Sequence, residues 1–307
     1  AMIPRQSGKA LSLDTPIPTP SGWTTMGDIK VGDQILGATG KPTTVTFATE
    51  IMYDRKCYQV KFDNGEIVVA DAEHLWEVTS SNWSKKRQTR TTEEIKAYLF
   101  PNPRENRRMY IETGEAVELP EQELLIKPYT LGVWLGDGNS YDGRYTQSVI
   151  DDEEISQFIQ VDGYTLSKPR INSTNSHIRT IYGIRPLLRQ LGVLKNKHIP
   201  QSYLRGSIQQ RLELLQGLMD TDGSIDPGGH CEFYQKNETL ILQVRELLSS
   251  LGIKSRHRRK TVKGQIYNIL VFTTNTFDVV RLNRKLERLH KAHNHPKNTR
   301  LYITDII

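Results

Sequence analysis

The sequence predicts an α+β protein in which a module of short strands precedes a domain of mixed helices and strands. Residues 22–79 alternate apolar and polar side chains in short runs separated by turn residues, whereas helical periodicity begins at Pro128. A phrase that starts just after Pro128 recurs once further along the chain, which indicates an internal duplication.

The composition is that of an ordinary globular protein. Of the 307 residues, 36% are hydrophobic and 25% are charged, and this length gives room for about two domains. No apolar run approaches the roughly 18 residues that a membrane helix needs, and the start lacks the pattern of a signal peptide. We therefore expect a cytoplasmic protein without a membrane partner, and we also expect it to be monomeric.

The cysteines argue against two kinds of structural site, and the distribution of charge favours one kind of binding partner. Cys57 and Cys231 lie far apart and form no CxxC pair, so neither a disulfide framework nor a zinc ribbon is indicated. The net charge is +6, with positive side chains gathered at Lys85 to Arg90 and at Lys254 to Lys260. A basic run is usually a solvated face, but two of them favour a polyanionic partner.

In the strand module, Thr44 to Phe47 and Tyr58 to Phe62 alternate, and the turn residues Asp63-Asn64-Gly65 follow the second run. Thr91 and Glu94 have the capping-box spacing that opens a short helix. Prolines are frequent from residue 101 onward, so we predict a connector over residues 99–127.

The duplicated phrase reads YTLGVWLGDG at residues 129–138 and LLQGLMDTDG at residues 214–223. Each copy is later followed by a helix with a similar ending, LLRQLGV at residues 187–193 and LLSSLGI at residues 247–253. Each phrase is an apolar helix that ends in Asp-Gly, and Pro128 suits the first turn of the first one.

Each phrase places a glycine five residues before an aspartate, Gly132 before Asp137 and Gly217 before Asp222. A glycine on the apolar face lets two helices approach backbone to backbone, which would bring both aspartates to one end of the interface. Carboxylates that close repel each other unless a divalent cation binds them. Hydrated Mg²⁺ there would suit phosphodiester hydrolysis. The plain alternative is two buried helices that end in Asp-Gly turns.

These two phrases resemble the paired motifs of the LAGLIDADG homing endonucleases, which cut double-stranded DNA at specific sites. The resemblance implies a pseudo-symmetric αββαββα domain over residues 128–290, with Asp137 and Asp222 as ligands of Mg²⁺. It also implies a lysine near the catalytic centre. Lys195 and Lys197 are the candidates, and Lys197 matches better because the family often has Ile-Pro shortly after this lysine. The alternative is a solvent-exposed lysine after a helix.

The second basic run, with the strand-like residues 265–272 (QIYNILVF), resembles half of the DNA-binding saddle of the same family. Its lysines and arginines would grip phosphates, while exposed strand residues would contact base edges. The alternative to an endonuclease is a protein that binds DNA through the same saddle but does not cut it.

The strand module resembles the Hint splicing domain of inteins. The matching words are SLDTPI at residues 12–17, MGDIKVGDQIL at 26–36 and DAEH at 71–74. The resemblance implies that residues 10–98 form the first part of a splicing domain and residues 291–307 the start of its last part. Splicing needs no cofactor.

In inteins a cysteine or serine precedes the first of these words and attacks the preceding carbonyl. Here that residue is Ala10, which has no nucleophilic atom. We therefore expect splicing to be disabled in this chain. By the same resemblance His74 would protonate the leaving nitrogen, unless it is a histidine packed beside Trp76. Asp71 stands where the family usually has threonine, so the resemblance does not predict which hydrogen bonds form around His74, although it does predict the position of His74.

Residues 4–9 (PRQSGK) resemble the phosphate loop of a phage terminase ATPase that is interrupted after its lysine. We predict that residues 1–9 are a remnant of such a host protein, the flanking extein. A nucleotide-binding ATPase fragment is the alternative, although prolines after Ala10 prevent the helix that such a loop opens.

The last seven residues resemble only the return into a splicing domain, whereas an intein should finish with two further strands and an asparagine. The pair His293-Asn294 mimics that ending, but His295-Pro296 follows it. The cluster of His290, His293 and His295 allows a zinc site, but without a fourth nearby ligand a polar helix end is favoured.

Overall fold

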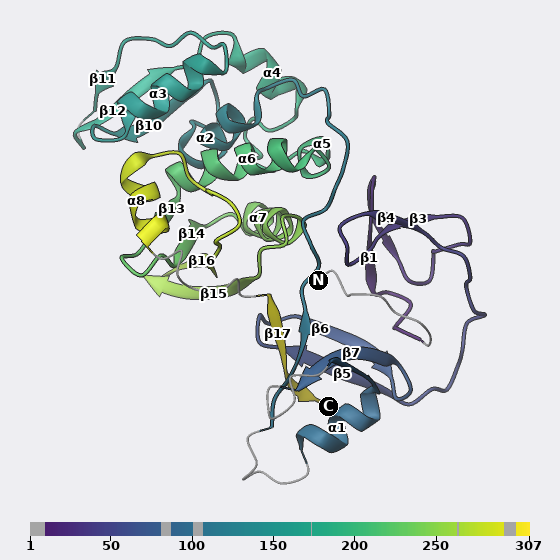
Figure 1. Cartoon of the computed structure of the whole chain (residues 1–307). Coiled ribbons are helices and arrows are strands. Elements are labelled where there is room, and N and C mark those ends of the chain that lie inside the picture. Colours follow the sequence, from purple (N-terminus) through teal and green to yellow (C-terminus); the bar gives the residue numbers. More distant parts are fainter. Residues whose placement is uncertain (1–9, 81–86, 101–106, 173, 263, 292–298) are drawn as a thin grey trace. The chain divides into compact units, whose positions relative to one another are not determined.

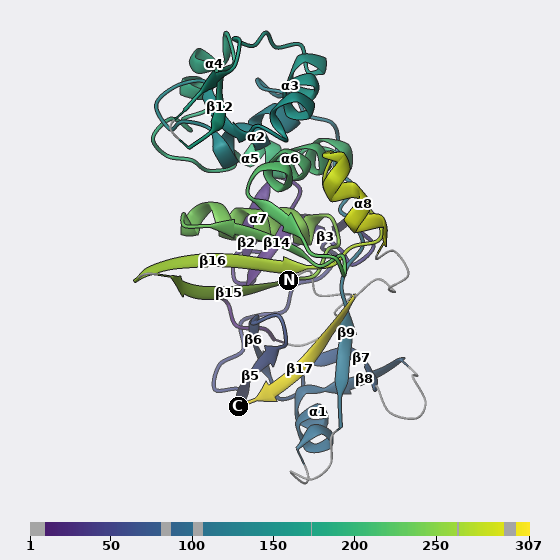
Figure 2. The same ribbon diagram turned by 90° about the vertical axis from the view of Figure 1, so that its left-hand side faces the viewer.

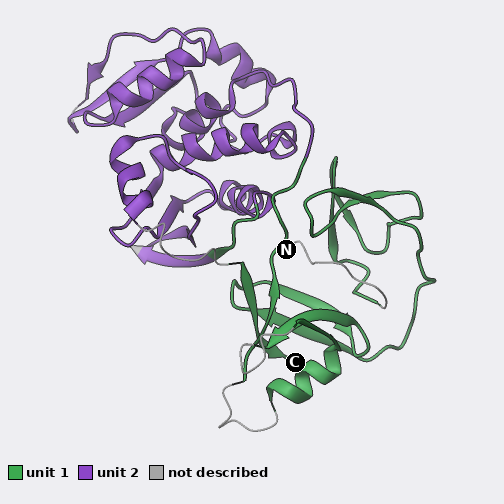
Figure 3. Cartoon of the chain, in the orientation of Figure 1, with its two compact units in different colours: residues 1–118, 252–256, 298–307 green, residues 119–251, 257–297 purple. Residues whose placement is uncertain are grey.

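The computed structural model describes residues 10–80, 87–100, 107–172, 174–262, 264–291 and 299–307. Figure 3 shows that the chain divides into two compact units. Unit 1 comprises residues 1–118, 252–256 and 298–307, and unit 2 comprises residues 119–251 and 257–297. The first unit is thus assembled from segments that lie on both sides of the second in the sequence.

Unit 1 is built around a six-stranded antiparallel sheet (Figure 1). Its strands, in spatial order, are β6 (Ile67–Asp71), β5 (Cys57–Phe62), β17 (Arg300–Ile306), β9 (Met109–Glu112), β7 (Leu75–Ser80) and β8 (Arg87–Thr91). Alternate residues of β5, namely Tyr58, Val60 and Phe62, are buried in the core, as the sequence alternation predicts.

Two small hairpins precede this sheet in the chain. They pair β1 (Pro16–Thr19) with β2 (Gly22–Thr25), and β3 (Gln34–Leu36) with β4 (Pro42–Thr44). The short helix α1 (Thr92–Leu99) begins at the predicted capping box, in which Thr91 and Glu94 exchange both hydrogen bonds.

One strand of the sheet comes from the stretch that we predicted to be a connector. β9, at residues 109–112, lies between β17 and β7. Its residues Met109, Tyr110 and Ile111 are buried, so the short run MYI is part of the core. The prolines around it hid this strand, because they interrupt the pattern on both sides.

Unit 2 has two similar halves. The first half contains α2 (Pro128–Asp137), β10 (Arg144–Ser148), α3 (Asp152–Val161), β11 (Arg170–Ile171), β12 (Ser176–Thr180) and α4 (Ile184–Gln190). The short α5 (Gln201–Leu204) leads to the second half, which contains α6 (Ile208–Thr221), β13 (Gly223–Ile225), β14 (Cys231–Gln235), α7 (Glu238–Ser250), β15 (Ser255–Val262), β16 (Gln265–Phe272) and α8 (Asn283–Lys291).

The second half follows the order αββαββα, and the first half differs in one place. Its first strand is reduced to a single bridge between Gly138 and Tyr145, where the second half pairs β13 with β14. The predicted α+β class, with a strand-rich module and a pseudo-symmetric domain of mixed helices and strands, is confirmed. No helix among the described residues is long and apolar enough to cross a membrane.

Candidate functional site

The two duplicated phrases form helices α2 and α6, which lie side by side in both views (Figures 1 and 2). A Cβ atom built on Gly132 would lie 2.4 Å from the Leu214 carbonyl oxygen, and one built on Gly217 would lie 2.2 Å from that of Tyr129. Each glycine Cα is 3.0 Å from the Cβ built on the other. Only glycine fits at these two positions, because the helix backbones themselves are in contact.

The two aspartates occupy equivalent places at the ends of these helices. Asp137 is the last residue of α2, and Asp222 caps α6 through its N–H, which donates to Leu218. Gln147 of β10 donates from Nε2 to Asp137 Oδ2 at 2.7 Å, and Gln235 of β14 donates to Asp222 Oδ2 at 3.1 Å. Each carboxylate is therefore oriented by a glutamine from the strand that follows it.

The two carboxylates influence each other electrostatically. Partial burial, and then the charge of Asp137, raise the pKa of Asp222 to about 7. Burial also raises the pKa of Asp137, against the opposing effect of Lys197. Two carboxyl groups that resist joint ionisation are a site where a cation is strongly favoured.

Of the two candidate lysines, Lys197 lies at this acidic end. Its Nζ donates to the Gly136 carbonyl at 3.0 Å and stands 5.3 Å from the Trp134 ring centroid. Burial lowers the pKa of Lys197 to about 8, although both aspartates act in the opposite direction. Lys195 instead places its Nζ 5.4 Å from the ring centroid of Tyr141.

A second lysine near the aspartates escaped the sequence analysis. Lys285 of α8 is only 4% exposed, and its Nζ donates to the carbonyls of Met219, Asp220 and Gly223 at 2.7 to 2.8 Å. Burial lowers the pKa of Lys285 to about 8, and its charge opposes the raised pKa values of both Asp137 and Asp222.

The donor set fits a hard divalent cation. No group of three His, Cys, Asp or Glu side chains is gathered for a metal anywhere in the described part of the chain. Two carboxylates at one end of a helix pair offer few protein ligands, and Mg²⁺ usually keeps several waters and takes substrate phosphates as further ligands. Asp137 and Asp222 would be the residues that hold it.

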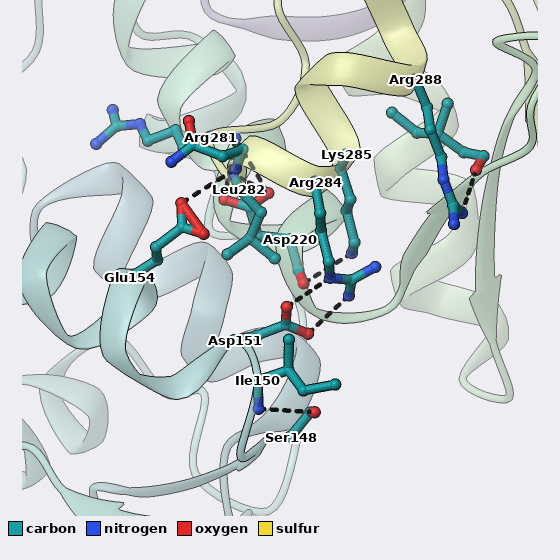
Figure 4. Close-up of polar contacts among 12 residues, drawn as sticks. Ser148, Ile150, Asp151, Glu154, Asp220, Arg281, Leu282, Arg284, Lys285 and Arg288 are labelled. Atoms are coloured by element: carbon teal, nitrogen blue, oxygen red, sulfur yellow. Dashed lines mark hydrogen bonds and ion pairs between the residues drawn. The ribbon is translucent and has the colours of Figure 1, made fainter.

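Beside this site, the start of α8 joins the two halves (Figure 4). Arg284 forms a two-point ion pair with Asp151 at 2.6 and 2.7 Å. The Asp220 carboxylate accepts the backbone N–H groups of Arg281 and Leu282, and it also accepts the hydroxyl of Tyr129. The end of α6 is thereby tied to the helices of the first half.

Most of the second predicted basic run, Lys254 to Lys260, lies in β15, but Lys254 precedes the strand and its Nζ donates to Asp63 Oδ2 at 2.6 Å. Arg256, Arg258 and Lys260 are exposed and occupy alternate positions, so they share one face of the strand. The predicted strand over residues 265–272 is observed as β16, next to β15 in the sheet.

In unit 1 the chain near residue 10 runs along β6. The carbonyl of Ala10 accepts the Asp71 N–H at 3.0 Å, and Leu11 bridges to Ala70. The Asp71 side chain is fully buried, and its Oδ2 accepts two hydrogen bonds from Arg55. Its Oδ1 is buried without a hydrogen-bond partner among the described residues. Ala10 and Asp71 are thus brought together.

His74 is fully buried in the turn that follows, where its N–H donates to the Asp71 carbonyl. Its ring stands edge-on to the Trp76 ring with centroids 4.8 Å apart. Trp76 is fixed in turn by donating from Nε1 to the hydroxyl of Thr92 at 2.9 Å. The histidine therefore both packs beside Trp76 and lies in the turn that holds Ala10.

The predicted histidine cluster falls mainly outside the described residues, because His293 and His295 belong to segment 292–298. His290 binds through Nε2 to Asp278 at 2.7 Å. Residues 1–9, expected to be a host remnant, also lie outside the described residues.

Comparison with known proteins bears on both units. Residues 209–286 match the LAGLIDADG-like domain. The matched segment contains α6 from its second residue onward, together with Asp222 and Lys285, which are half of the site described above. The chain is 42% identical over 306 residues to the replicative DNA helicase DnaB of Mycobacterium intracellulare, a match that covers 92% of this chain and 50% of the helicase.

Two solved structures are among those similar to parts of this chain. The MchDnaB-1 intein is 52% identical over 28% of this chain and 60% of its own, with a TM-score of 0.24. The homing endonuclease I-DmoI in complex with DNA and Ca is 16% identical over 54% of this chain and 97% of its own, with a TM-score of 0.39. The chain spans about half the length of the curated helicase and 60% of the solved intein.

The terminase prediction is wrong, because the relative matched over most of the chain is a replicative helicase. Phosphate loops that end in Gly-Lys-Ser/Thr occur in many nucleotide hydrolases, so residues 4–9 are too few to distinguish one host from another.

Proposed function

We propose that this chain is an intein inserted in a protein similar to the replicative helicase DnaB, and that unit 2 is a Mg²⁺-dependent, site-specific double-strand DNA endonuclease. One observation carries the endonuclease proposal: the backbone contact at Gly132 and Gly217 brings Asp137 and Asp222 to one end of the helix pair. Because the proposed substrate is genomic DNA, we also place the chain in the cytosol.

The reaction is hydrolysis of a phosphodiester. A water attacks phosphorus, the bond to the leaving sugar oxygen breaks, and a proton moves to that oxygen. A cation held by Asp137 and Asp222 would lower the pKa of a water and neutralise charge on the leaving oxygen. Gln147 and Gln235 hold the two carboxylates in place. Lys197, buried and held at Gly136, presents a positive charge where the phosphate gains negative charge.

The endonuclease proposal is tested on an uninterrupted helicase gene. Purified chain with Mg²⁺ or Mn²⁺ should cut both strands at the site where the insertion lies in the interrupted gene. Asp137→Asn and Asp222→Asn should each abolish cutting, whereas Asp278→Asn, which changes an exposed carboxylate of the same unit, should not. Binding without any cutting would leave the DNA-binding insert as the better account.

For the splicing unit we propose that residue 10 cannot start the reaction in this chain. An acyl shift at the Lys9–Ala10 bond needs a thiol or hydroxyl at residue 10, and alanine supplies neither. His74 and Asp71 are the residues that would act on this bond, because the same turn holds Ala10 in place.

This second proposal has its own test. Ala10→Cys should create a thioester that dithiothreitol cleaves, releasing residues 1–9, which mass spectrometry detects. The unchanged chain should release nothing, and His74→Ala added to Ala10→Cys should slow the release. Equal release from the unchanged chain would show that residue 10 is not the relevant nucleophile.

A further inference from the structure

The first basic run of the sequence lies in unit 1 and has no part in the functions proposed above. Residues 81–108 hold eight Lys or Arg and three Asp or Glu. The flanking residues, 1–80 and 109–118 taken together, hold seven Lys or Arg and thirteen Asp or Glu. Positive charge is therefore concentrated in one segment of a module that is otherwise acidic. Such a localised cluster points to a polyanion partner more specifically than a basic excess spread over the whole surface would.

The described part of this segment forms the edge of the six-stranded sheet and the helix that follows. β8 is one of the two edge strands of this sheet, and α1 begins directly after it. Arg87 is 62% exposed on β8 and contacts Glu77 at 3.0 Å, and Arg108 is exposed just before β9. Arg87 stands on an ordered strand, because β8 pairs with β7 along its whole length.

Two further arginines are stacked on one aromatic ring. The guanidinium carbons of Arg90 and Arg107 lie 5.5 and 4.9 Å from the ring centroid of Tyr98. The ring is oriented by a hydrogen bond between its hydroxyl and Ser80, and Arg107 also donates to the Tyr98 carbonyl at 3.3 Å. A stacked guanidinium keeps its charge, and its planar fork suits phosphate oxygens.

We propose that Arg87, Arg90, Arg107 and Arg108 form a second DNA-binding surface, which contacts the phosphate backbone and lies entirely in unit 1. This inference extends the proposed function, because it adds contacts to the same DNA substrate.

A protein partner fits this surface less well. Protein interfaces centre on buried apolar and aromatic anchors, whereas Phe100 is the one large apolar side chain that is exposed among residues 87–100. Guanidinium groups on an edge strand and in the segment just before β9, with few apolar neighbours, instead match the phosphate contacts that dominate nucleic-acid affinity.

The test measures how salt weakens binding of the full chain to a mixed-sequence duplex of about 40 base pairs, without divalent metal, so that neither cleavage nor target sequence matters. Arg87→Gln combined with Arg90→Gln should make the slope of log K against log salt concentration shallower by about 1.8, since each phosphate contact contributes about 0.9. Lys30→Gln combined with Lys41→Gln removes the same charge from exposed positions of unit 1 and should leave the slope unchanged.

A third double variant separates this inference from the proposed function. Arg258→Gln with Lys260→Gln tests the basic face of β15. If the Arg258/Lys260 variant makes the slope shallower while the Arg87/Arg90 variant does not, the proposed unit 1 surface is wrong and DNA binding by unit 2 stands. The opposite result supports the unit 1 surface and contradicts the proposed saddle. Hydrogen exchange should also show DNA-dependent protection of residues 87–99, and unchanged exchange there would overturn the inference.

Discussion

At the scale of residues, the site depends on charged groups that are kept partly out of water. Lys197 sits between a carbonyl, an aromatic ring and two carboxylates, and burial lowers its pKa to about 8. An ammonium in such surroundings interacts more strongly with a phosphate than a solvated lysine would.

Replacement of this lysine should therefore act on the chemical step. Lys197→Met is expected to slow DNA cleavage by about 100-fold while changing DNA affinity little, because loss of one preorganised donor typically has an effect of this size. Lys195→Met, two residues away over Tyr141, is the control and should cut at nearly the normal rate. Single-turnover cleavage gives both rates, and equal loss in the two variants would contradict the role of Lys197.

The sequence predicted the two aspartates because they end a repeated phrase. It did not predict Gln147, Gln235 or Lys285, because the glutamines follow their aspartates at unequal spacings within unremarkable strands. A signal for Lys285 was nevertheless present. Lys197 follows Asp137 by 60 residues, and Lys285 follows Asp222 by 63. Aligning the two halves as repeats would have paired these lysines.

At the scale of elements, the contact between α2 and α6 fixes the site. Gly132 of α2 and Gly217 of α6 face each other across the contact. Movement of a side chain cannot make room for a methyl group there, because the opposing atoms are backbone. Any larger residue at either position would therefore push the two helices apart, and this would also increase the distance between the two aspartates.

Gly217→Ala should consequently lower the free energy of unfolding of unit 2 by about 3 kcal/mol or more, as overpacking against backbone does. Gly228→Ala is the matched control, since a Cβ there meets nothing closer than 3.3 Å. Urea unfolding measures both. A Gly217→Ala chain as stable as the Gly228→Ala chain would show that the helices are not in backbone contact.

Some elements with local signals were predicted well. Strand β16 and helix α2 coincide closely with their sequence patterns, whereas α6 begins six residues before its repeated phrase. Of the alternating run Thr44 to Phe47, only the first residue lies in a strand. The strands β9 and β17 are different, because their place in the sheet depends on pairing with residues far away in the chain. No local pattern specifies such a partner.

At the scale of the whole molecule, unit 1 is completed by a distant segment. β17 at residues 300–306 lies between β5 and β9, so it fills the middle of the sheet rather than its edge. Leu301 and Ile303 of this strand are buried in the unit 1 core. The stability of unit 1 therefore depends on residues that follow unit 2 in the sequence.

Leu301→Ala is expected to destabilise unit 1 by about 2 to 5 kcal/mol, the usual range for a buried leucine. Hydrogen exchange followed by mass spectrometry should show faster exchange throughout β5, β7 and β9, while α6 and α7 of unit 2 exchange as before. Exchange that rises only within residues 300–306 would mean that β17 is an accessory strand.

The central claim is that Asp137 and Asp222 together hold one catalytic cation at the end of the α2–α6 pair. Crystals of the chain with target DNA and Mn²⁺ test it directly through anomalous scattering. We expect a strong anomalous peak within bonding distance of both carboxylates, about 2.0 to 2.2 Å from their oxygens, and none there in Asp222→Asn. A metal peak elsewhere, or one that contacts neither aspartate, would contradict the account.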